Sequence, residues 1–190
     1  MMRIITGRAR GVRLASLEGE TTRPTAERVK EAVFSMLQFE IEDRQVLDLF
    51  GGSGQMALEA VSRGASHAVM ADRSKEAVEI MKKNALKTKL APDCEIFCAD
   101  YTELLRTCRG RRKFDLVFLD PPYAMGLLPK VLAMMLEYKI LSPNCTVVCE
   151  SARAEDVFEK DETLASRFEI RKEAKYGAAY VTLLRLKEEA

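Results

Sequence analysis

Asp120-Pro121-Pro122-Tyr123 is a tetrapeptide whose groups suit the handling of an exocyclic amine on a nucleic-acid base. Such an amine is a poor nucleophile because its lone pair is delocalised into the ring, so a catalyst must orient it with one acceptor for each N–H bond. We expect the Asp120 carboxylate and the Pro121 backbone carbonyl to be these acceptors, and the prolines to stiffen the loop. Tyr123 offers a flat face to an extruded base, worth about 1–3 kcal/mol in comparable sites. This chemistry needs no metal and no histidine base.

A glycine-rich loop, Gly52-Ser53-Gly54-Gln55-Met56-Ala57, lies upstream and matches the pattern G-x-G-x-x-A between an expected strand and an expected helix. Asp72 stands twenty residues after Gly52. Glycines let a backbone approach a ligand closely, and an acid at the end of the next strand can accept hydrogen bonds from ribose hydroxyls. The pattern predicts a nucleotide-like ligand, but alone it fits a dinucleotide, S-adenosylmethionine or a simple tight turn.

Two further acids favour S-adenosylmethionine as the cofactor. Asp48, inside the expected first strand, suits the positively charged amino-acid end of this cofactor and would repel a dinucleotide pyrophosphate. Asp100 closes the expected third strand, where it can accept a hydrogen bond from an adenine amino group. With Asp72 and Asp120, these acids lie within or at the ends of four parallel strands, so we expect them along one edge of the sheet.

The elements that position these residues follow from an alternation of β-rich runs and helical patterns after residue 45. Strands are expected at 46–50, 67–71, 94–99, 114–119 and 146–150, and a hairpin at 168–175 and 180–186. Helices are expected at 55–63, after Ser74 with the apolar stripe Ala77, Val78, Met81 and Leu86, at 101–108 and at 127–137. The prediction is an α/β fold with helices on both faces of a mostly parallel sheet of about seven strands, closed by an antiparallel C-terminal hairpin.

Length and composition predict a single cytoplasmic domain, which we expect to be a monomer. The 190 residues suffice for a core, and no run is long enough for a membrane span or a signal peptide. We divide the chain into a basic segment at 1–22, a leader helix region at 23–44 and a catalytic core at 45–190. Thr25 is expected to cap the leader helix, whose apolar side is Val29, Val33, Phe34 and Leu37. The five cysteines, which lack C-x-x-C spacing, are expected to be reduced and buried, and His67 to be structural.

The first thirty residues carry seven positive side chains against three acids, although the net charge of the chain is only +1. This asymmetry favours contact with a polyanion, while a solvated arm is an equally good interpretation of the composition. Residues 3–14 can pair as a small hairpin or stay mobile. A second basic cluster, Arg109-Gly110-Arg111-Arg112-Lys113, precedes the fourth strand, so we expect it as a solvated turn at the opposite edge, outside the catalytic groove.

These motifs together resemble those of the bacterial guanine-N2 methyltransferases of small-subunit (16S) ribosomal RNA, within the S-adenosylmethionine-dependent enzymes of Rossmann-like fold. The resemblance covers nearly the whole chain. It is carried by Arg3-Ile4-Ile5-Thr6-Gly7, Arg23-Pro24-Thr25 with Arg28 and Val29, the stretches 48–54, 58–60 and 62–65, Asp120–Tyr123 and Lys175-Tyr176-Gly177. The Arg-Pro-Thr leader and the closing Tyr-Gly point to this family, since the other motifs are shared by many amino-methyltransferases.

The resemblance implies a role for individual residues of this chain. S-adenosylmethionine, with S-adenosylhomocysteine as product, would bind at Thr25, Asp48, Phe50, Gly51, Gly52, Gly54, Asp72, Arg73, Asp100 and Tyr101. The guanine would be handled by Asp120, Pro121 and Tyr123. Ribosomal RNA, free or within a small-subunit assembly particle, would be held by Arg8, Arg10, Arg13, Arg23 and Arg28. The chain departs from the family at Gly51, where alanine is usual, at Asp72, where glutamate is commoner, and at Ala178-Ala179, where polar residues are more usual.

Three alternatives remain open from the sequence. Adenine N6 and cytosine N4 of DNA or RNA present similar amines, and the tetrapeptide does not rank them. A nicotinamide-dependent oxidoreductase would explain the glycine loop and Asp72 but not the tetrapeptide. A non-catalytic RNA-binding protein on the same scaffold would bind RNA without transferring a methyl group.

Overall fold

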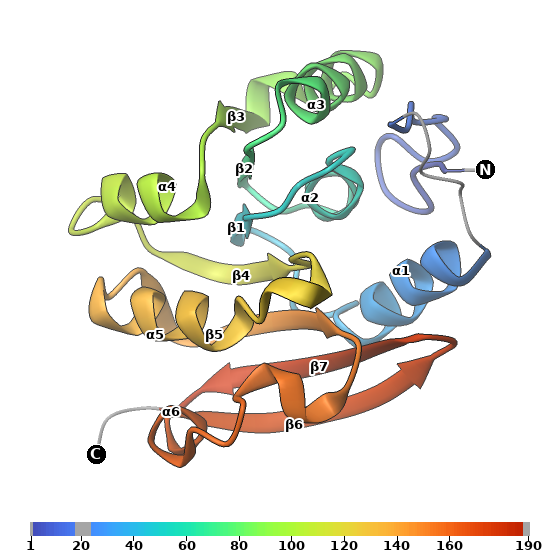
Figure 1. Ribbon diagram of the computed structural model, residues 1–190. Coiled ribbons are helices and arrows are strands. Elements are labelled where there is room, and N and C mark those ends of the chain that lie inside the picture. Colours follow the sequence, from blue (N-terminus) through green and yellow to red (C-terminus); the bar gives the residue numbers. More distant parts are fainter. Residues whose placement is uncertain (1, 18–23, 188–190) are drawn as a thin grey trace.

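The computed structural model describes residues 2–17 and 24–187, except for the side chains of 24–26, as one seven-stranded sheet between helices (Figure 1). The strands are β1 (Gln45–Asp48), β2 (His67–Asp72), β3 (Cys94–Cys98), β4 (Phe114–Leu119), β5 (Leu141–Ser151), β6 (Phe168–Tyr176) and β7 (Ala179–Leu186). The helices are α1 (Pro24–Met36), α2 (Gln55–Ser62), α3 (Lys75–Lys87), α4 (Tyr101–Cys108), α5 (Leu128–Glu137) and α6 (Glu162–Ser166), with the short turns η1 (Ala91–Asp93), η2 (Tyr123–Met125) and η3 (Ala154–Val157). None of the described helices is long and apolar enough to cross a membrane.

The sheet, in the order β3-β2-β1-β4-β5-β7-β6, is parallel from β3 to β5 and ends in an antiparallel pair. β1 lies between β2 and β4, with Val46 beside Ala68 on one side and Leu116 on the other. The chain order reverses between β1 and β4, and sheets of this kind bind ligands beside such a point, outside the carboxyl ends of the strands. The fold class predicted from the sequence is confirmed.

Two layers of helices bury the two faces of the sheet. α1, α2 and α3 pack on one face, where the ring centroids of Phe34 and Phe118 lie 5.8 Å apart. α4, α5 and α6 supply apolar side chains to the other face, among them Leu105, Val131 and Leu164. β4 is almost continuously apolar because both of its faces are covered. The ends of the strands are therefore the part of the sheet that is left for a ligand.

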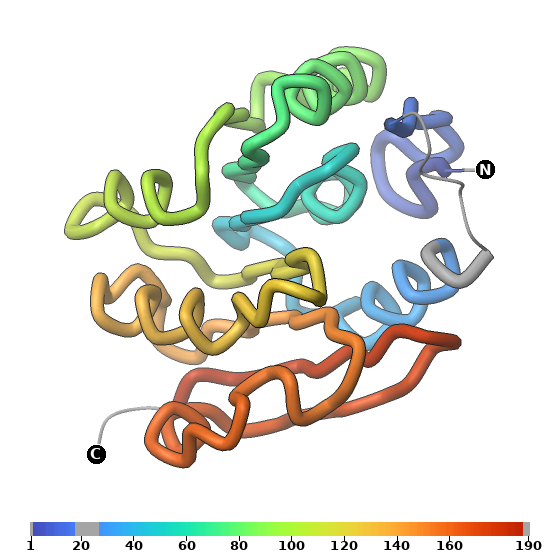
Figure 2. Tube along the Cα trace, viewed as in Figure 1, coloured from blue at the N-terminus to red at the C-terminus, as the bar shows by residue number. Residues whose placement is uncertain are grey.

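The N-terminal segment forms a small hairpin, one of the two arrangements that its sequence allowed. Arg3 and Arg13 form an antiparallel bridge, and Ile4 N donates a hydrogen bond to Val12 O over 3.0 Å. The Ile4 side chain is buried in the same core as α1 and α2. Figure 2 shows this segment beside α2. The hairpin (residues 3–13) is thus part of the folded molecule.

Three local predictions are wrong. Thr25 lies inside α1 and does not cap it, because the helix begins at Pro24, whose missing N–H suits the first helical position. Leu86 is 70% exposed, since the buried stripe of α3 runs through Ala85 and the next residue is turned about 100° around the helix. Cys98 is exposed, near the free edge of the sheet that β3 forms.

β5 begins five residues before the expected strand, at Leu141. The pairing of β4 with β5 shifts register early in the strand, and Asn144 has a φ of 59° in the left-handed region. The regular pairing starts with Leu116 beside Thr146, where the sequence predicted the strand. The irregular first half contains Pro143, which has no N–H to give to a sheet.

Candidate active site

Four carboxylates meet in one cavity at the carboxyl edge of the parallel strands. Asp48 and Asp72 are the last residues of β1 and β2. Asp100 comes two residues after β3, and Asp120 directly follows β4. All four line a cavity of about 470 Å³. Residues far apart in the sequence meet there because parallel strands carry their carboxyl ends to the same edge.

The glycine loop between β1 and α2 brings backbone atoms to this cavity. Gly52 and Gly54 have φ values of 52° and 76°, in the left-handed region that favours glycine. Gly52 N donates to Asp72 Oδ2 over 3.1 Å, which ties the loop to the end of β2. A Cβ on Gly54 would lie 3.1 Å from Met70 Sδ, so this glycine permits close packing of α2 and does not line the cavity.

Asp48 is a buried carboxylate in the cavity wall, only 4% exposed. Ala57 N donates to its Oδ2 over 3.4 Å, and no cationic side chain among the described residues pairs with it. Burial raises the pKa of Asp48 to about 7, and the neighbouring Asp72 adds to the rise. A buried carboxylate is stabilised by a positive partner, so this part of the cavity fits a cationic group of a ligand.

Asp72 and Asp100 also organise the backbone around the cavity. Asp72 Oδ1 accepts from a backbone N–H at the start of α3 over 2.8 Å, and Asp100 Oδ1 caps α4 by accepting from Thr102 N over 2.9 Å. The rings of Phe50 and Tyr101, with centroids 5.9 Å apart, form part of the same wall. Aromatic walls rimmed by carboxylates suit a flat heterocycle and a ribose that donate hydrogen bonds.

The loop after β4 carries the predicted reaction centre. Asp120 is exposed and Pro121 is buried, and both line the cavity with Tyr123. Tyr123 is 42% exposed, and its hydroxyl donates to Glu150 Oε1 over 2.6 Å. Burial is the main cause that raises the pKa of Tyr123, and the Glu150 carboxylate raises it further. The phenol therefore stays protonated at neutral pH. The half-open ring leaves room for a base to stack on it.

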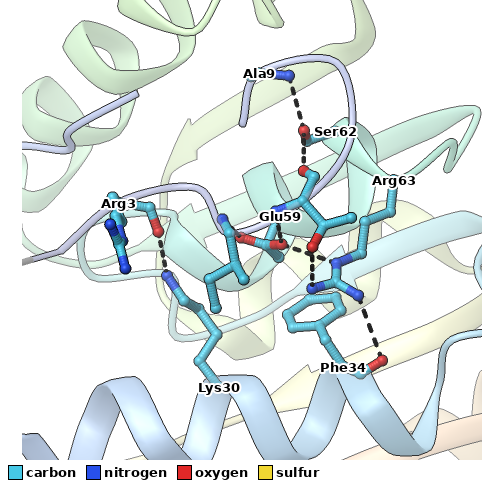
Figure 3. Close-up of polar contacts among 9 residues, drawn as sticks. Arg3, Ala9, Lys30, Phe34, Glu59, Ser62 and Arg63 are labelled. Atoms are coloured by element: carbon cyan, nitrogen blue, oxygen red, sulfur yellow. Dashed lines mark hydrogen bonds and ion pairs between the residues drawn. The ribbon is translucent and has the colours of Figure 1, made fainter. Parts of the chain in front are cut away.

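The N-terminal hairpin is held on α2 by a polar cluster (Figure 3). The Glu59 side chain is fully buried and accepts from Ile5 N over 2.7 Å and from Thr6 N over 3.0 Å. Arg63 Nε donates to the same carboxylate over 2.8 Å, and Ser62 makes two further hydrogen bonds with the segment. Hydrogen bonds to an ionised carboxylate are stronger than neutral ones, so this cluster fixes the hairpin in position.

Asn84 connects the same segment to the glycine loop. Its Nδ2 donates to Ala15 O over 3.0 Å and to Ser53 O over 2.9 Å, while its Oδ1 accepts from Ala15 N over 2.8 Å. Leu17, two residues further on, lines the cavity. Sequence reasoning did not assign Leu17 or Asn84 to the site, because neither belongs to a motif. The signal that could have indicated Asn84 is a polar side chain on the apolar side of an amphipathic helix.

The basic residues expected to hold RNA differ in their surroundings. Arg10 and Arg13 on the hairpin and Arg28 on α1 are exposed. Arg8 instead forms an ion pair with Asp93 of η1. Three of the expected cations are thus presented to solvent, while the fourth connects the hairpin to η1.

Lys30 is a positive residue that does not face solvent, although it counted toward the basic N-terminal asymmetry. It is buried in α1 and its Nζ donates to Arg3 O over 2.6 Å. Burial lowers the pKa of Lys30, against the pull of nearby acids. Arg23 and the side chain of Thr25, both expected at the site, lie outside the described residues.

The second basic cluster, Arg109–Lys113, lies at the opposite edge of the sheet, as expected. It lines a separate open cleft with Tyr138 and Lys139. Arg112 donates to Glu95 Oε1 over 2.8 Å, and His67 Nε2 lies 2.9 Å from the same oxygen. These contacts brace the start of the sheet, and they give His67 a structural partner.

Comparison with known proteins relates the whole chain to one family. The family described as "Conserved hypothetical protein 95" matches residues 2–185. The chain belongs to this family. The Bacillus subtilis protein named "Putative rRNA methyltransferase YlbH" is 34% identical over 183 residues, 96% of this chain and 97% of that protein. Ribosomal RNA small subunit methyltransferase D of Haemophilus influenzae is 34% identical over 153 residues, 80% of this chain and 79% of that protein.

A solved structure agrees with the same relationship. The structure titled "Putative methyltransferase yhhF from Escherichia coli" superposes with a TM-score of 0.86 at 28% identity, covering 99% of each chain. The predicted resemblance to bacterial methyltransferases of small-subunit ribosomal RNA is confirmed.

Eleven of the thirteen residues expected at the cofactor and the reaction centre line the cavity of about 470 Å³ described above. They are Asp48, Phe50, Gly51, Gly52, Asp72, Arg73, Asp100, Tyr101, Asp120, Pro121 and Tyr123. Gly54 and Thr25 are the other two. The cavity wall also includes Gln55, Met56 and Phe118, which the sequence assigned to the helix and strand that flank the motifs.

Proposed function

We propose that this family member transfers the methyl group of S-adenosylmethionine to the exocyclic N2 of a guanine in small-subunit ribosomal RNA, leaving S-adenosylhomocysteine. The observation that carries the proposal is the single cavity in which four strand-end carboxylates meet Tyr123. A ligand with a cationic end, a ribose and an adenine uses three of these carboxylates and leaves Asp120 for the acceptor base. The names of the relatives, which are rRNA methyltransferases, support RNA as the substrate.

The cavity fits S-adenosylmethionine in charge and in size. Its volume of about 470 Å³ falls within the range of roughly 300–1,000 Å³ for small-molecule sites. Asp48 would hold the ammonium group, Asp72 the ribose hydroxyls and Asp100 the adenine, between the aromatic walls Phe50 and Tyr101. When bound, S-adenosylmethionine supplies an electrophilic methyl group on a sulfonium.

Asp120 and Pro121 would orient the guanine amine. The Asp120 carboxylate accepts one N–H and the Pro121 carbonyl accepts the other, which directs the nitrogen lone pair toward the methyl group. The nitrogen becomes positively charged as it gains the methyl group, so its attraction to Asp120 grows toward the transition state. Asp120 is exposed, so it can pass the released proton to water. Tyr123 would hold the plane of the base by stacking.

The exposed cations Arg10, Arg13 and Arg28 would contact the RNA backbone. Such contacts fix the register of a protein on a nucleic acid without reading its sequence. The described residues build one sheet with its helices and no second domain for RNA, which favours the preformed surface of a small-subunit assembly particle as the substrate. We also propose that the protein acts as a monomer, in the cytoplasm.

The proposal is tested by transfer of labelled methyl groups to free ribosomal RNA and to small-subunit particles from cells that lack the gene, followed by nucleoside analysis. We expect the label in N2-methylguanosine, with more transfer to particles than to free RNA. Label in N6-methyladenosine alone would contradict the choice of guanine. RNA binding without any transfer would contradict an enzymatic role.

A further inference from the structure

Glu150 approaches the reaction loop from the neighbouring strand. Its Oε1 accepts the Tyr123 hydroxyl over 2.6 Å. In the pairing of β4 with β5, Leu119 lies beside Cys149, so the next residues, Asp120 and Glu150, stand level at the ends of the two strands. The two carboxylates therefore face the same loop, one at its start and one beneath its aromatic residue.

Glu150 lines a small cavity beneath the loop, which shares Pro121, Pro122 and Tyr123 with the larger cavity. The lining of this space includes Pro121, Pro122, Tyr123, Leu128 and Ser151. Among the residues that the structure describes, no cation pairs with the Glu150 carboxylate, and Tyr123 donates a hydrogen bond to it. Glu150 is half-buried, and this burial raises the pKa of its carboxyl group. A carboxylate that is partly removed from water is stabilised by a hydrogen-bond donor, and the Tyr123 hydroxyl supplies one.

We propose that Glu150 is a positioning residue, which fixes the Tyr123 ring as the face on which the target base stacks. The proposal rests on the proposed function of the site. Tyr123 begins a turn of only three residues, η2, which ends at Gly126 in the left-handed region. Such a short turn gives the ring little support, so the bond at its hydroxyl end determines its orientation.

The orientation of the ring matters for methyl transfer because it sets the plane of the base. The plane of the base in turn sets how the amine nitrogen meets Asp120 and the Pro121 carbonyl. A displacement of about 1 Å in a reacting group can cost roughly 100-fold in rate. Loss of the Glu150 hydrogen bond should therefore lower kcat and leave cofactor binding unchanged, because Glu150 is not part of the lining around Asp48, Asp72 and Asp100.

A double-mutant cycle tests this coupling through methyl transfer to small-subunit particles. We expect Tyr123→Phe and Glu150→Ala each to lower kcat by about tenfold, and the double variant to be no worse than either, because both remove the same hydrogen bond. Glu150→Gln should keep most of the activity, since its amide oxygen can still accept the phenol. Binding of S-adenosylhomocysteine should stay within twofold of the wild type in all variants. Glu155→Ala, an exposed acid on η3, serves as the matched control and should have wild-type kcat.

Additive losses in the double variant would overturn the proposal, because Glu150 would then act on the substrate by another route. Full activity of Glu150→Ala would also overturn it. If Glu150→Ala does not fold, Tyr123→Phe and Glu150→Gln decide the matter, since loss of activity in Glu150→Gln with full activity in Tyr123→Phe contradicts the coupling.

Carbon-13 NMR of labelled tyrosine rings gives a test that needs no activity. The pKa of Tyr123 lies above its ordinary value because of burial and the Glu150 carboxylate. In Glu150→Ala we expect this tyrosine to ionise at lower pH than in the wild type, with Tyr123→Phe to assign the signal. An unchanged titration would overturn the positioning role. If the wild type methylates no RNA, the proposed function fails, and the titration still decides whether Glu150 holds Tyr123.

Discussion

We expect Asp48 to couple cofactor binding to pH, because a carboxylate with a pKa of about 7 must be ionised to hold a cation. In the free protein roughly a tenth of the molecules carry ionised Asp48 at pH 6 and about nine tenths at pH 8. Binding at low pH has to expel the proton, so affinity rises with pH. We predict that S-adenosylhomocysteine binds about tenfold more tightly at pH 8 than at pH 6, as measured by calorimetry.

The Asp48→Asn variant is the control for this dependence. An amide keeps the size of the side chain and cannot ionise, so the variant should bind more weakly at pH 8 and show a flat profile. A profile that persists in Asp48→Asn would assign the pH dependence to another group. The exposed Asp43→Asn variant should keep the wild-type profile.

Asp120 is predicted to act on the acceptor base and not on the cofactor. Asp120→Ala should lower kcat by about 100-fold or more, the usual cost of removing one group that stabilises a developing charge. Its affinity for S-adenosylhomocysteine should change by less than twofold, because Asp48, Asp72 and Asp100 are intact. Single-turnover methyl transfer and equilibrium binding measure the two quantities. An equal loss in kcat and in affinity for S-adenosylhomocysteine would instead assign Asp120 to the cofactor site.

The four acids of the cavity could be predicted from the sequence because each stands in or just after a recognisable strand. Glu150 could not, although its strand was predicted. Its partner Tyr123 is 27 residues away, and the contact depends on which strands are neighbours and in what register. Local patterns predict elements, whereas contacts between strands need the sheet.

Helix starts show the same limit at the scale of elements. Ser74 was predicted to cap α3, and its hydroxyl accepts from Ala77 N over 3.3 Å. Thr25 has the same capping chemistry, yet α1 begins one residue earlier at Pro24. Proline fixes a helical φ at the first position, and this preference outweighs the capping preference of the threonine. The sequence alone does not show which of these two preferences, one residue apart, sets the start of the helix.

The N-terminal hairpin depends on α2 through Glu59, whose burial no sequence pattern indicated. Glu59→Ala removes the acceptor of two backbone N–H groups and the counter-charge near buried Lys30. We predict a loss of about 3–5 kcal/mol in the free energy of unfolding, as for other broken buried charge pairs. Urea denaturation measures this loss, and hydrogen exchange should rise at Ile5 and Thr6. The exposed Glu42→Ala variant should stay within about 0.5 kcal/mol of the wild type.

Over the whole molecule, the alternation of strands and helices sufficed to predict a parallel sheet with a hairpin at its C-terminal edge. The place of the second basic cluster, away from the reaction loop, also followed from the direction of the strands, since the start and the end of β4 lie at opposite edges. What could not be predicted is how much charge remains free at each cluster. Arg8, Lys30 and Arg112 are all taken up by partners inside the molecule.

Arg10 and Arg13, which are exposed on the hairpin, give a prediction for RNA binding by the whole molecule. Replacing Arg10 and Arg13 together with alanine should weaken binding to small-subunit particles and lower the slope of log K against log salt by about 1.4–1.8, the contribution of two phosphate contacts. Arg111→Ala with Lys113→Ala removes the same charge from the second basic cluster, which we expect to lie outside the RNA contact, so it should leave both affinity and slope unchanged. Filter binding from 50 to 200 mM salt measures both. Equal effects of the two pairs would mean that RNA is attracted by total charge, whereas an effect of the hairpin pair alone would mean that the RNA contacts the hairpin.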